Sequence, residues 1–189
     1  MVAFAARDFP KTVGLRDGAT VTVRPLASTD TVKLWDFFSA LPEPDRYFMK
    51  DDVLDPATTA RWTSNIDHDR ALALVAVSDD AIVADGVLLK QADPARRHLA
   101  EVRVNITPGF QGKGLGTVLI RELAEIAWEA DVEVLGFELV EGVQDAAIEA
   151  VRGLGAFHVG TLQGYLRDPN GEPRSLVLYQ IPLGSWFKF

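Results

Sequence analysis

A glycine-rich stretch is the first part of the chain whose residues could do chemistry. It consists of Gln111, Gly112, Lys113, Gly114, Leu115 and Gly116. Glycines let an anion approach backbone N–H groups closely, and a helix that begins here would add the positive end of its dipole. Lys113 supplies a mobile positive charge as well. The stretch therefore predicts a binding site for a pyrophosphate group.

The flanking residues predict the elements that hold this stretch. Residues 101–106 are rich in β-branched side chains and alternate in polarity, which is typical of a strand. Residues 107–109, Thr-Pro-Gly, end that strand. From Thr117 to Trp128, apolar residues recur at helical spacing. A strand, a glycine loop and a helix then follow one another, which leaves the first N–H groups of the helix without partners inside it.

The loop pattern differs from two better-known phosphate sites. It is not the G-x-x-x-x-G-K-S/T pattern of P-loop NTPases, and it is not a clean G-x-G-x-x-G followed by a ribose-binding acid. An ordinary turn that caps a helix is the alternative interpretation. The agreement of strand, proline turn, glycines and amphipathic helix favours a binding site.

Composition limits the classes of function. The chain has 189 residues, of which 48% are hydrophobic and 24% charged, and this is typical of a globular domain with a core of its own. The net charge of −8 disfavours nucleic-acid binding and suits a cationic acceptor such as a lysine or a polyamine. The absence of cysteine excludes a thiol nucleophile, a disulfide and a cysteine-ligated metal. His68, His98 and His158 lack ligand spacing, so we expect no metal site.

We expect a cytoplasmic protein made of one domain, residues 1–189. No apolar run reaches the roughly 18 residues that a membrane span needs, and no leader pattern follows Met1. An N-terminal arm, residues 1–18, ends in a turn, and an aromatic tail, residues 184–189, packs on the domain or on a second chain in a homodimer. The other predicted elements are a strand at 20–25, a helix at 30–39 capped by Ser28 or Thr29, a proline-rich loop at 41–48, a helix at 55–66, a hairpin of strands at 71–78 and 81–91, a strand at 134–139, a helix at 144–154, and a hairpin of strands at 157–166 and 175–182.

These features resemble the GCN5-related N-acetyltransferase (GNAT) superfamily. The glutamine and glycine spacing of residues 111–116 is similar to the motif that holds the pyrophosphate of acetyl-CoA in that family, and the predicted element order matches over residues 20–183. The resemblance implies an α/β fold (α+β in some schemes) with a mixed, mostly antiparallel sheet, helices on both faces and splayed strands at the acetyl-CoA groove. It also implies an acyltransferase that moves the acetyl group of acetyl-CoA directly to a primary amine, without a metal.

A narrower resemblance is to the bacterial Pat-type protein lysine acetyltransferases. Residues 16–26, residues 45–47 and the position of Glu101 ten residues before Gln111 look like that group. This resemblance implies a protein lysine as acceptor. A small-molecule amine remains open, and so does a catalytically weakened module that senses acyl-CoA.

The resemblance also implies roles for residues of the predicted strand and loop. Val104, Asn105 and Ile106 would pair with the pantetheine arm, and a backbone N–H near Val104 would stabilise the oxyanion. Glu101 would be the general base, acting through a water. Alternation places Arg103 on the same face, roughly 6.5–7 Å from Glu101 along the strand, and pairing with it would lower the pKa of Glu101. The residues expected to bind the cofactor are Val104, Asn105, Ile106, Gln111, Gly112, Lys113, Gly114, Leu115, Gly116, Thr117 and Gln144.

Two positions depart from the family pattern. Gln144 stands where the family has an asparagine that holds pantetheine, and Val151 stands where a tyrosine often protonates the leaving thiolate. Tyr165 or Tyr179 is the replacement candidate for that acid. Weaker candidates are Glu138 and Glu141 as a second carboxylate, and Asp51, Asp52 and Asp55 with Tyr47 and Phe48 as a cation-attracting entrance.

Overall fold

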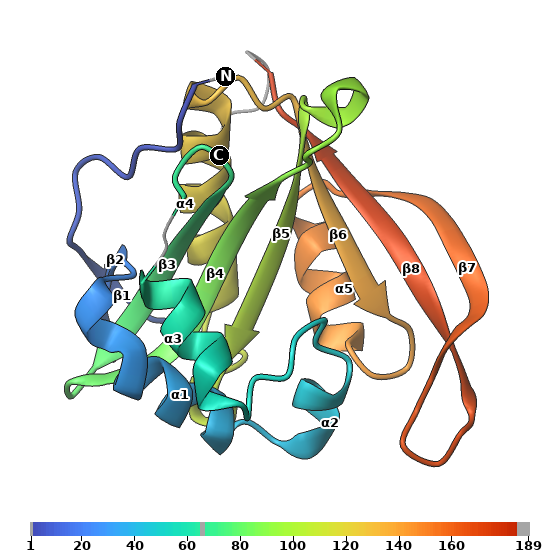
Figure 1. Cartoon of the computed structure of the whole chain (residues 1–189), viewed down its shortest axis with the longest axis horizontal. Coiled ribbons are helices and arrows are strands. Elements are labelled where there is room, and N and C mark those ends of the chain that lie inside the picture. Colours follow the sequence, from blue (N-terminus) through green and yellow to red (C-terminus); the bar gives the residue numbers. More distant parts are fainter. Residues whose placement is uncertain (1, 65–66, 185–189) are drawn as a thin grey trace.

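One mixed sheet organises the molecule. A computed structural model describes residues 2–64 and 67–184. Within these residues the sheet is eight-stranded with the order β1-β2-β3-β4-β5-β6-β8-β7 (Figure 1). β5 and β6 pair in parallel, and all the other neighbouring strands of this sheet pair antiparallel. The strands are β1 (Lys11–Gly14), β2 (Thr20–Pro25), β3 (Ala71–Ser78), β4 (Ala81–Lys90), β5 (Leu99–Ile106), β6 (Val134–Val140), β7 (Phe157–Arg167) and β8 (Pro173–Pro182).

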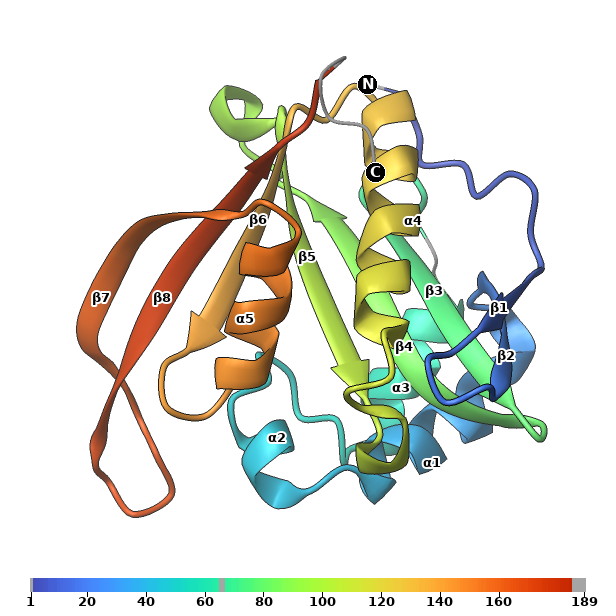
Figure 2. The same ribbon diagram turned by 180° about the vertical axis from the view of Figure 1, so that it is seen from behind.

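Helices cover both faces of the sheet. One face carries α1 (Thr31–Ala40), α2 (Glu43–Tyr47) and α3 (Pro56–Ser64), as Figure 1 shows. The opposite face carries α4 (Leu115–Glu129) and α5 (Asp145–Gly153), seen in front in Figure 2. Short 3-10 helices lie at Ser28–Asp30, Pro94–Arg96 and Pro108–Phe110.

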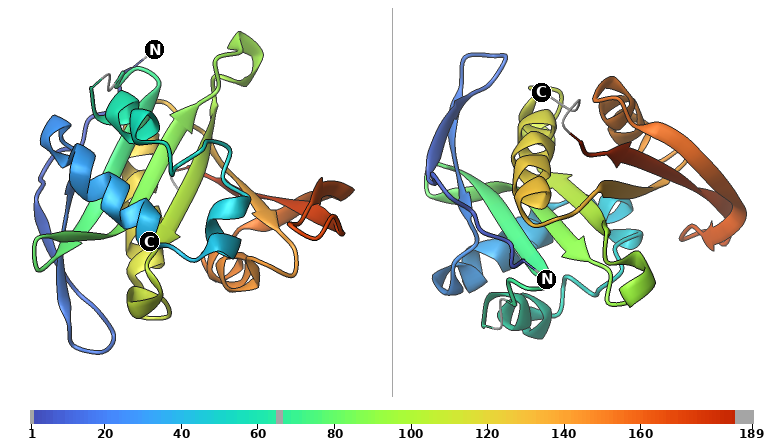
Figure 3. Two further views of the ribbon diagram at one scale, coloured as in Figure 1. Left: turned by 60° about the horizontal axis from the view of Figure 1, so that its bottom comes forward. Right: turned by 90° about the horizontal axis from the view of Figure 1, so that it is seen from above.

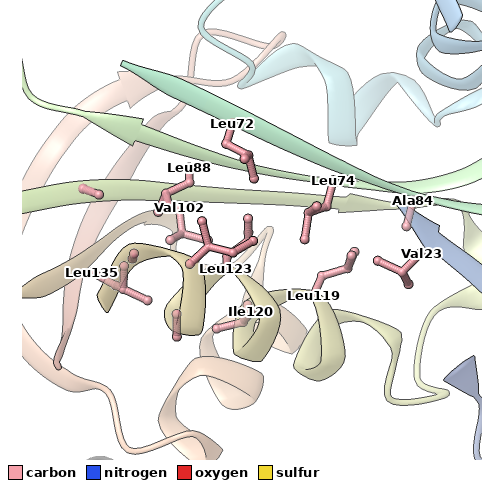
Figure 4. Close-up of a cluster of buried hydrophobic side chains, with 14 of the residues drawn as sticks. Val23, Leu72, Leu74, Ala84, Leu88, Val102, Leu119, Ile120, Leu123 and Leu135 are labelled. Carbon is pink, nitrogen blue, oxygen red and sulfur yellow. The ribbon is translucent and has the colours of Figure 1, made fainter. Parts of the chain in front are cut away.

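The main core lies between the sheet and α4. Leu119 and Leu123 recur at i and i+4 on α4 and are fully buried against apolar side chains of the sheet such as Leu88 and Val102 (Figure 4). Each buried leucine contributes roughly 1.5–3 kcal/mol relative to an exposed one. This packing fixes the start of α4, and with it the glycine loop, relative to β5. A second apolar cluster, which includes Leu34 of α1, packs on the other face.

The sheet opens between β5 and β6. Their parallel pairing joins Leu99–Glu101 to Val134–Gly136 and is not continued further among the described residues. The other edge of β5 stays paired with β4 as far as Ile106, and β6 stays paired with β8 up to Val140. The two strands therefore diverge towards their C-terminal ends, which leaves one backbone edge of β5 facing the gap (Figures 1 and 3).

The structure confirms most predicted elements and corrects three details. Residues 11–14 of the predicted arm form β1 at the sheet edge, a strand too short for its alternation to stand out in the sequence. The predicted loop at 41–48 contains α2, a single helical stretch after Pro42. Ser28 and Thr29 do not cap α1, because they belong to the 3-10 helix Ser28–Asp30 that precedes it. The carboxylate of Asp30 accepts the Ala27 N–H at 2.8 Å.

Two sequence predictions fall on residues outside the described part of the chain. The predicted helix at 55–66 is seen as α3 up to Ser64, and residues 65–66 lie outside the description. Residues 185–189 of the predicted aromatic tail also lie outside it.

Candidate active site

The glycine loop is shaped by its backbone. Gly112 and Gly114 adopt φ values of +71° and +90°, the left-handed region that glycine enters without a steric penalty. Gly114 directly precedes α4. In the described part of the chain, the backbone N–H groups of Gly112, Lys113 and Gly114 donate to no protein acceptor. These N–H groups, together with those of the first turn of α4, form a cradle suited to a phosphate group.

Close packing brings this cradle next to β5. A Cβ atom placed on Gly116 would lie 3.2 Å from Cδ1 of Ile106, so the glycine lets α4 begin close to the strand. The side chain of Gln111 closes the loop on the other side, where its Nε2 donates to the carbonyl of Ile106 at 2.9 Å. The loop and the C-terminal end of β5 therefore form one continuous surface.

Arg16 is a cation at the cradle and was not among the residues predicted to bind the cofactor. It lines the cavity described below, and a Cβ atom on Gly114 would lie 3.4 Å from its Nε. The ammonium of Lys113 turns instead to Asp17, at 2.7 Å, and this bond lowers the pKa of Asp17. The role of Lys113 in binding stays a prediction. No local pattern points to Arg16, because its position depends on how the β1–β2 hairpin folds back on the loop.

A cavity of about 1080 Å³ joins the cradle to the face covered by α1, α2 and α3. This volume is slightly above the usual range of about 300–1,000 Å³ for small-molecule sites. Glu101 lines the cavity together with most residues predicted to bind the cofactor. The latter are Val104, Asn105, Ile106, Gln111, Gly112, Gly114, Leu115, Gly116, Thr117 and Gln144.

Glu101 is held by two cations. Its Oε1 accepts hydrogen bonds from Nε of Arg103 at 2.7 Å and from Nζ of Lys50 at 2.8 Å, and its side chain is 13% exposed. Burial alone would raise the pKa of Glu101, but the bonds from Arg103 and Lys50 outweigh burial and lower it. The predicted placement of Arg103 on the same face as Glu101 is therefore confirmed, and the two side chains pair. In this arrangement Glu101 is a weak base.

Lys50 links the two strands that diverge. Its Nζ also lies 2.7 Å from Oε2 of Glu138 on β6. Glu138 is two residues beyond Gly136, where the pairing of β5 with β6 stops. Burial opposes the charge on Lys50, but the two carboxylates outweigh burial and raise its pKa. Glu138 was a candidate from sequence, whereas Lys50 was not, because it lies between α2 and α3 and far from both carboxylates in sequence.

Asp85 is a second buried carboxyl group of the cavity wall. It lies opposite Asn105 in the β4–β5 register and accepts a hydrogen bond from Asn105 Nδ2 at 2.9 Å. Burial raises the pKa of Asp85 to about 7, and the bond from Asn105 and the charge of Arg103 only partly oppose this. Asp85 was not among the residues predicted for the site, although it is a lone acid inside the apolar run of residues 81–89.

The residues that depart from the family pattern lie on or near the same wall. Gln144 precedes α5, and its Oε1 accepts the Val140 N–H at 2.8 Å. Val151 is buried and lines the cavity. Tyr165 also lines the cavity and is 65% exposed, whereas Tyr179 packs beside the His158 ring. Tyr165 is thus the better-placed of the two tyrosines to meet a ligand.

The predicted acidic entrance is only partly assembled. Asp51 lines the cavity and pairs with Arg61 at 3.3 Å. The carboxylates of Asp52 and Asp55 accept backbone N–H groups two residues further on and so stabilise local turns.

The described residues contain no group of three or more His, Cys, Asp or Glu side chains arranged to hold a metal ion. Within the same part of the chain, no helix has the length and apolar character needed to cross a membrane.

Comparison with known proteins identifies the family. Residues 34–156 match the model of the acetyltransferase (GNAT) family. The chain is also 30% identical over 156 residues to an acetyltransferase of Pseudomonas aeruginosa, covering 80% of this chain and 81% of that protein. The chain therefore belongs to the GNAT family, and it is an acyltransferase enzyme.

Solved structures agree on the fold. The GNAT domain of S. lividans PAT has a TM-score of 0.75 at 22% identity, covering 92% of this chain and 97% of that one. A Sinorhizobium meliloti phosphinothricin acetyltransferase in complex with AcCoA has a TM-score of 0.75 at 21% identity, covering 87% and 89%. These similarities confirm the predicted fold, a mixed and mostly antiparallel sheet with helices on both faces.

Proposed function

We propose that this enzyme transfers the acetyl group of acetyl-CoA to a primary amine. The observation that carries the proposal is the alignment of three features along one cavity: the N–H cradle of the glycine loop, the free edge of β5 and the carboxylate of Glu101. A diphosphate at the cradle would direct the pantetheine arm along β5, where backbone groups from Val102 onward face the gap. The complex of the S. meliloti relative with AcCoA supports this choice of donor.

The residues assigned to the donor follow from this path. The loop residues Gln111 to Thr117 would bind the pyrophosphate through backbone N–H groups, with Arg16 and Lys113 as nearby cations. Val104, Asn105 and Ile106 would hold pantetheine, and Gln144 would contact it from the opposite wall. A backbone N–H near Val104 would stabilise the negative charge that develops on the thioester oxygen.

The chemistry needs a neutral amine beside the thioester. A free lysine side chain has a pKa of about 10.4, so most of the acceptor arrives as an ammonium ion. Glu101 would take the proton through a water, and the amine nitrogen would attack the carbonyl carbon while the carbon–sulfur bond breaks. The thiolate then needs a proton. Val151 cannot supply it, and Tyr165 is the phenol on the cavity wall.

The charges of the site support a cationic acceptor. The cavity presents the carboxylates of Glu101 and Glu138, and the chain carries a net charge of −8. Both favour a cationic primary amine over a neutral one. The likeness to Pat-type enzymes favours a protein lysine, and a small-molecule amine is the other form of the same acceptor chemistry.

A second candidate function is a sensor that binds acyl-CoA with weakened catalysis. The observation in its favour is that Glu101 is bound by Arg103 and Lys50, which lower its pKa and its strength as a base. Both functions require donor binding, so binding alone does not separate them.

Glu101→Gln separates the two functions. Purified protein is mixed with acetyl-CoA and a panel of amines and lysine peptides, and release of the CoA thiol is followed while calorimetry measures CoA binding. For an enzyme, we expect the variant to keep CoA binding and to lose roughly 10²–10⁴-fold in rate, which is typical of general-base removal. Glu149→Gln, an exposed change on α5, is the matched control. A parent protein that binds CoA and acetylates none of the panel would favour the sensor.

A further inference from the structure

The ammonium of Lys50 lies in the cavity beside Glu101, the proposed general base. It is bonded to Glu101 of β5 at 2.8 Å and to Glu138 of β6 at 2.7 Å, so it bridges the opening between the two strands. The backbone segment that carries Lys50 crosses this opening between α2 and α3 (Figure 1). The same cavity is lined by Val104 and by the glycine loop.

Lys50 differs from the other lysines in this respect. Among the lysines of the described residues, it alone lines the cavity. Lys33 is also paired with a carboxylate, that of Asp80, but this pair lies on the surface and Asp80 is largely exposed. Lys33 therefore has the same side-chain chemistry without access to the proposed thioester.

We propose that Lys50 is an acceptor in its own active site, so that the enzyme acetylates itself at this residue. The inference depends on the proposed function, because it uses the same donor and the same carboxylates. A bond forms between Nζ of Lys50 and the acetyl carbon, and the carbon–sulfur bond of the thioester breaks. The proton lost by the ammonium passes to Glu101 or Glu138, and the CoA thiolate leaves and is protonated from solvent.

Acetylation would change the state of Glu101. The acetylated side chain is neutral, so it no longer forms an ion pair with either carboxylate. Glu101 would then keep Arg103 as its charged partner and would become a stronger base. The modification would therefore remove the group that competes with an external amine and would strengthen the base that serves it.

The test uses the full chain and acetyl-CoA without any acceptor. Peptide mass spectrometry follows the acetyl occupancy of Lys50 and of Lys33 with time. We expect Lys50 to be labelled at least about tenfold faster than Lys33, because a bound donor has a high effective concentration. A non-reactive thioether analogue of acetyl-CoA should suppress the labelling of Lys50 and leave that of Lys33 unchanged. Lys50→Arg should abolish the fast labelling and leave the slow labelling of Lys33 in place.

Protein concentration tests whether the reaction occurs within one molecule. The fractional rate at Lys50 should not change when the protein is diluted, whereas a rate that rises with protein concentration would overturn the assignment to its own site. Equal labelling of Lys50 and Lys33, or labelling that the analogue does not suppress, would also overturn it.

Two parallel measurements separate this inference from the proposed function. If the protein binds CoA by calorimetry and acetylates external amines while Lys50 stays unmodified, self-acetylation is wrong and the proposed function stands. If calorimetry detects no CoA binding, both fail together.

Discussion

The buried carboxyl group of Asp85 makes the stability of this protein depend on pH. Asp85 is 4% exposed, and burial raises the pKa of its carboxyl group from 3.8 to about 7. In the unfolded chain this carboxyl group ionises near pH 4, whereas in the folded protein it keeps its proton up to about pH 7. The folded state therefore binds more protons in this window. The stability that Asp85 contributes is complete at low pH and is lost as the pH rises through about 7.

The size of the effect follows from the shift. A difference of about 3 pKa units, at 1.36 kcal/mol per unit, gives a total loss of about 4 kcal/mol in the free energy of unfolding. About 3 kcal/mol of this loss occurs between roughly pH 5 and pH 8. Above about pH 8 the carboxyl group is ionised in both the folded and the unfolded chain, so the free energy of unfolding no longer changes through Asp85.

Asp85→Asn should remove this dependence. Asparagine keeps an acceptor oxygen for the Nδ2 of Asn105, which now donates at 2.9 Å, and it does not ionise. Urea unfolding of both proteins at a series of pH values measures the free energy of unfolding. We expect the variant to gain about 3 kcal/mol relative to the parent between roughly pH 5 and pH 8.

The matched control is Asp79→Asn in the exposed β3–β4 turn. Asparagine tolerates the φ of +48° at this position, so the free energy of unfolding should change by less than about 0.5 kcal/mol at every pH. Parallel stability curves for the parent and Asp85→Asn would refute the reasoning, since they would mean that Asp85 titrates alike in the folded and unfolded chains.

Two further changes test the rest of the site. Lys50→Gln removes one of the two cations that lower the pKa of Glu101, so the acidic limb of the kcat/KM profile should move to higher pH; an unmoved limb would show that Glu101 does not act as the base. Gly114→Ala places a side chain at a φ of +90°, which should lower the free energy of unfolding by about 1–2 kcal/mol. Because the loop must then shift its N–H groups, CoA affinity by calorimetry should fall by about tenfold or more, and unchanged affinity would place the pyrophosphate elsewhere.

The sequence was most informative where a pattern is local. The alternation of residues 101–106 and the helical spacing after Thr117 predicted β5, α4 and the loop between them, because both patterns repeat within a few residues. The same alternation predicted that Arg103 shares a face with Glu101, where the two side chains form a hydrogen bond. The short elements β1 and α2 were missed, because four or five residues contain too few repeats to show a period.

The contacts that assemble the site were not predictable in this way. Lys50 and Glu101 are 51 residues apart, and their bond depends on where the sheet parts. The burial of Asp85 depends on helices that cover one face of the sheet. Arg16 reaches the cradle only because the β1–β2 hairpin folds back on it. Each of these contacts arises from tertiary packing, which cannot be predicted from a single segment of sequence.

The charges around the opening of the sheet also bear on the choice of acceptor. Glu101 and Glu138 come from the two diverging strands, and Lys50 brings one positive charge to both. An external amine that displaces Lys50 would favourably replace this charge, because Glu101 would otherwise keep only Arg103 and Glu138 would lose the cation it pairs with. A primary ammonium supplies that charge and a neutral amine does not. If Glu101 is the base, as proposed, the arrangement that weakens it in the free enzyme would also favour a cation in place of Lys50, and Glu101 would have to remove the proton of that cation.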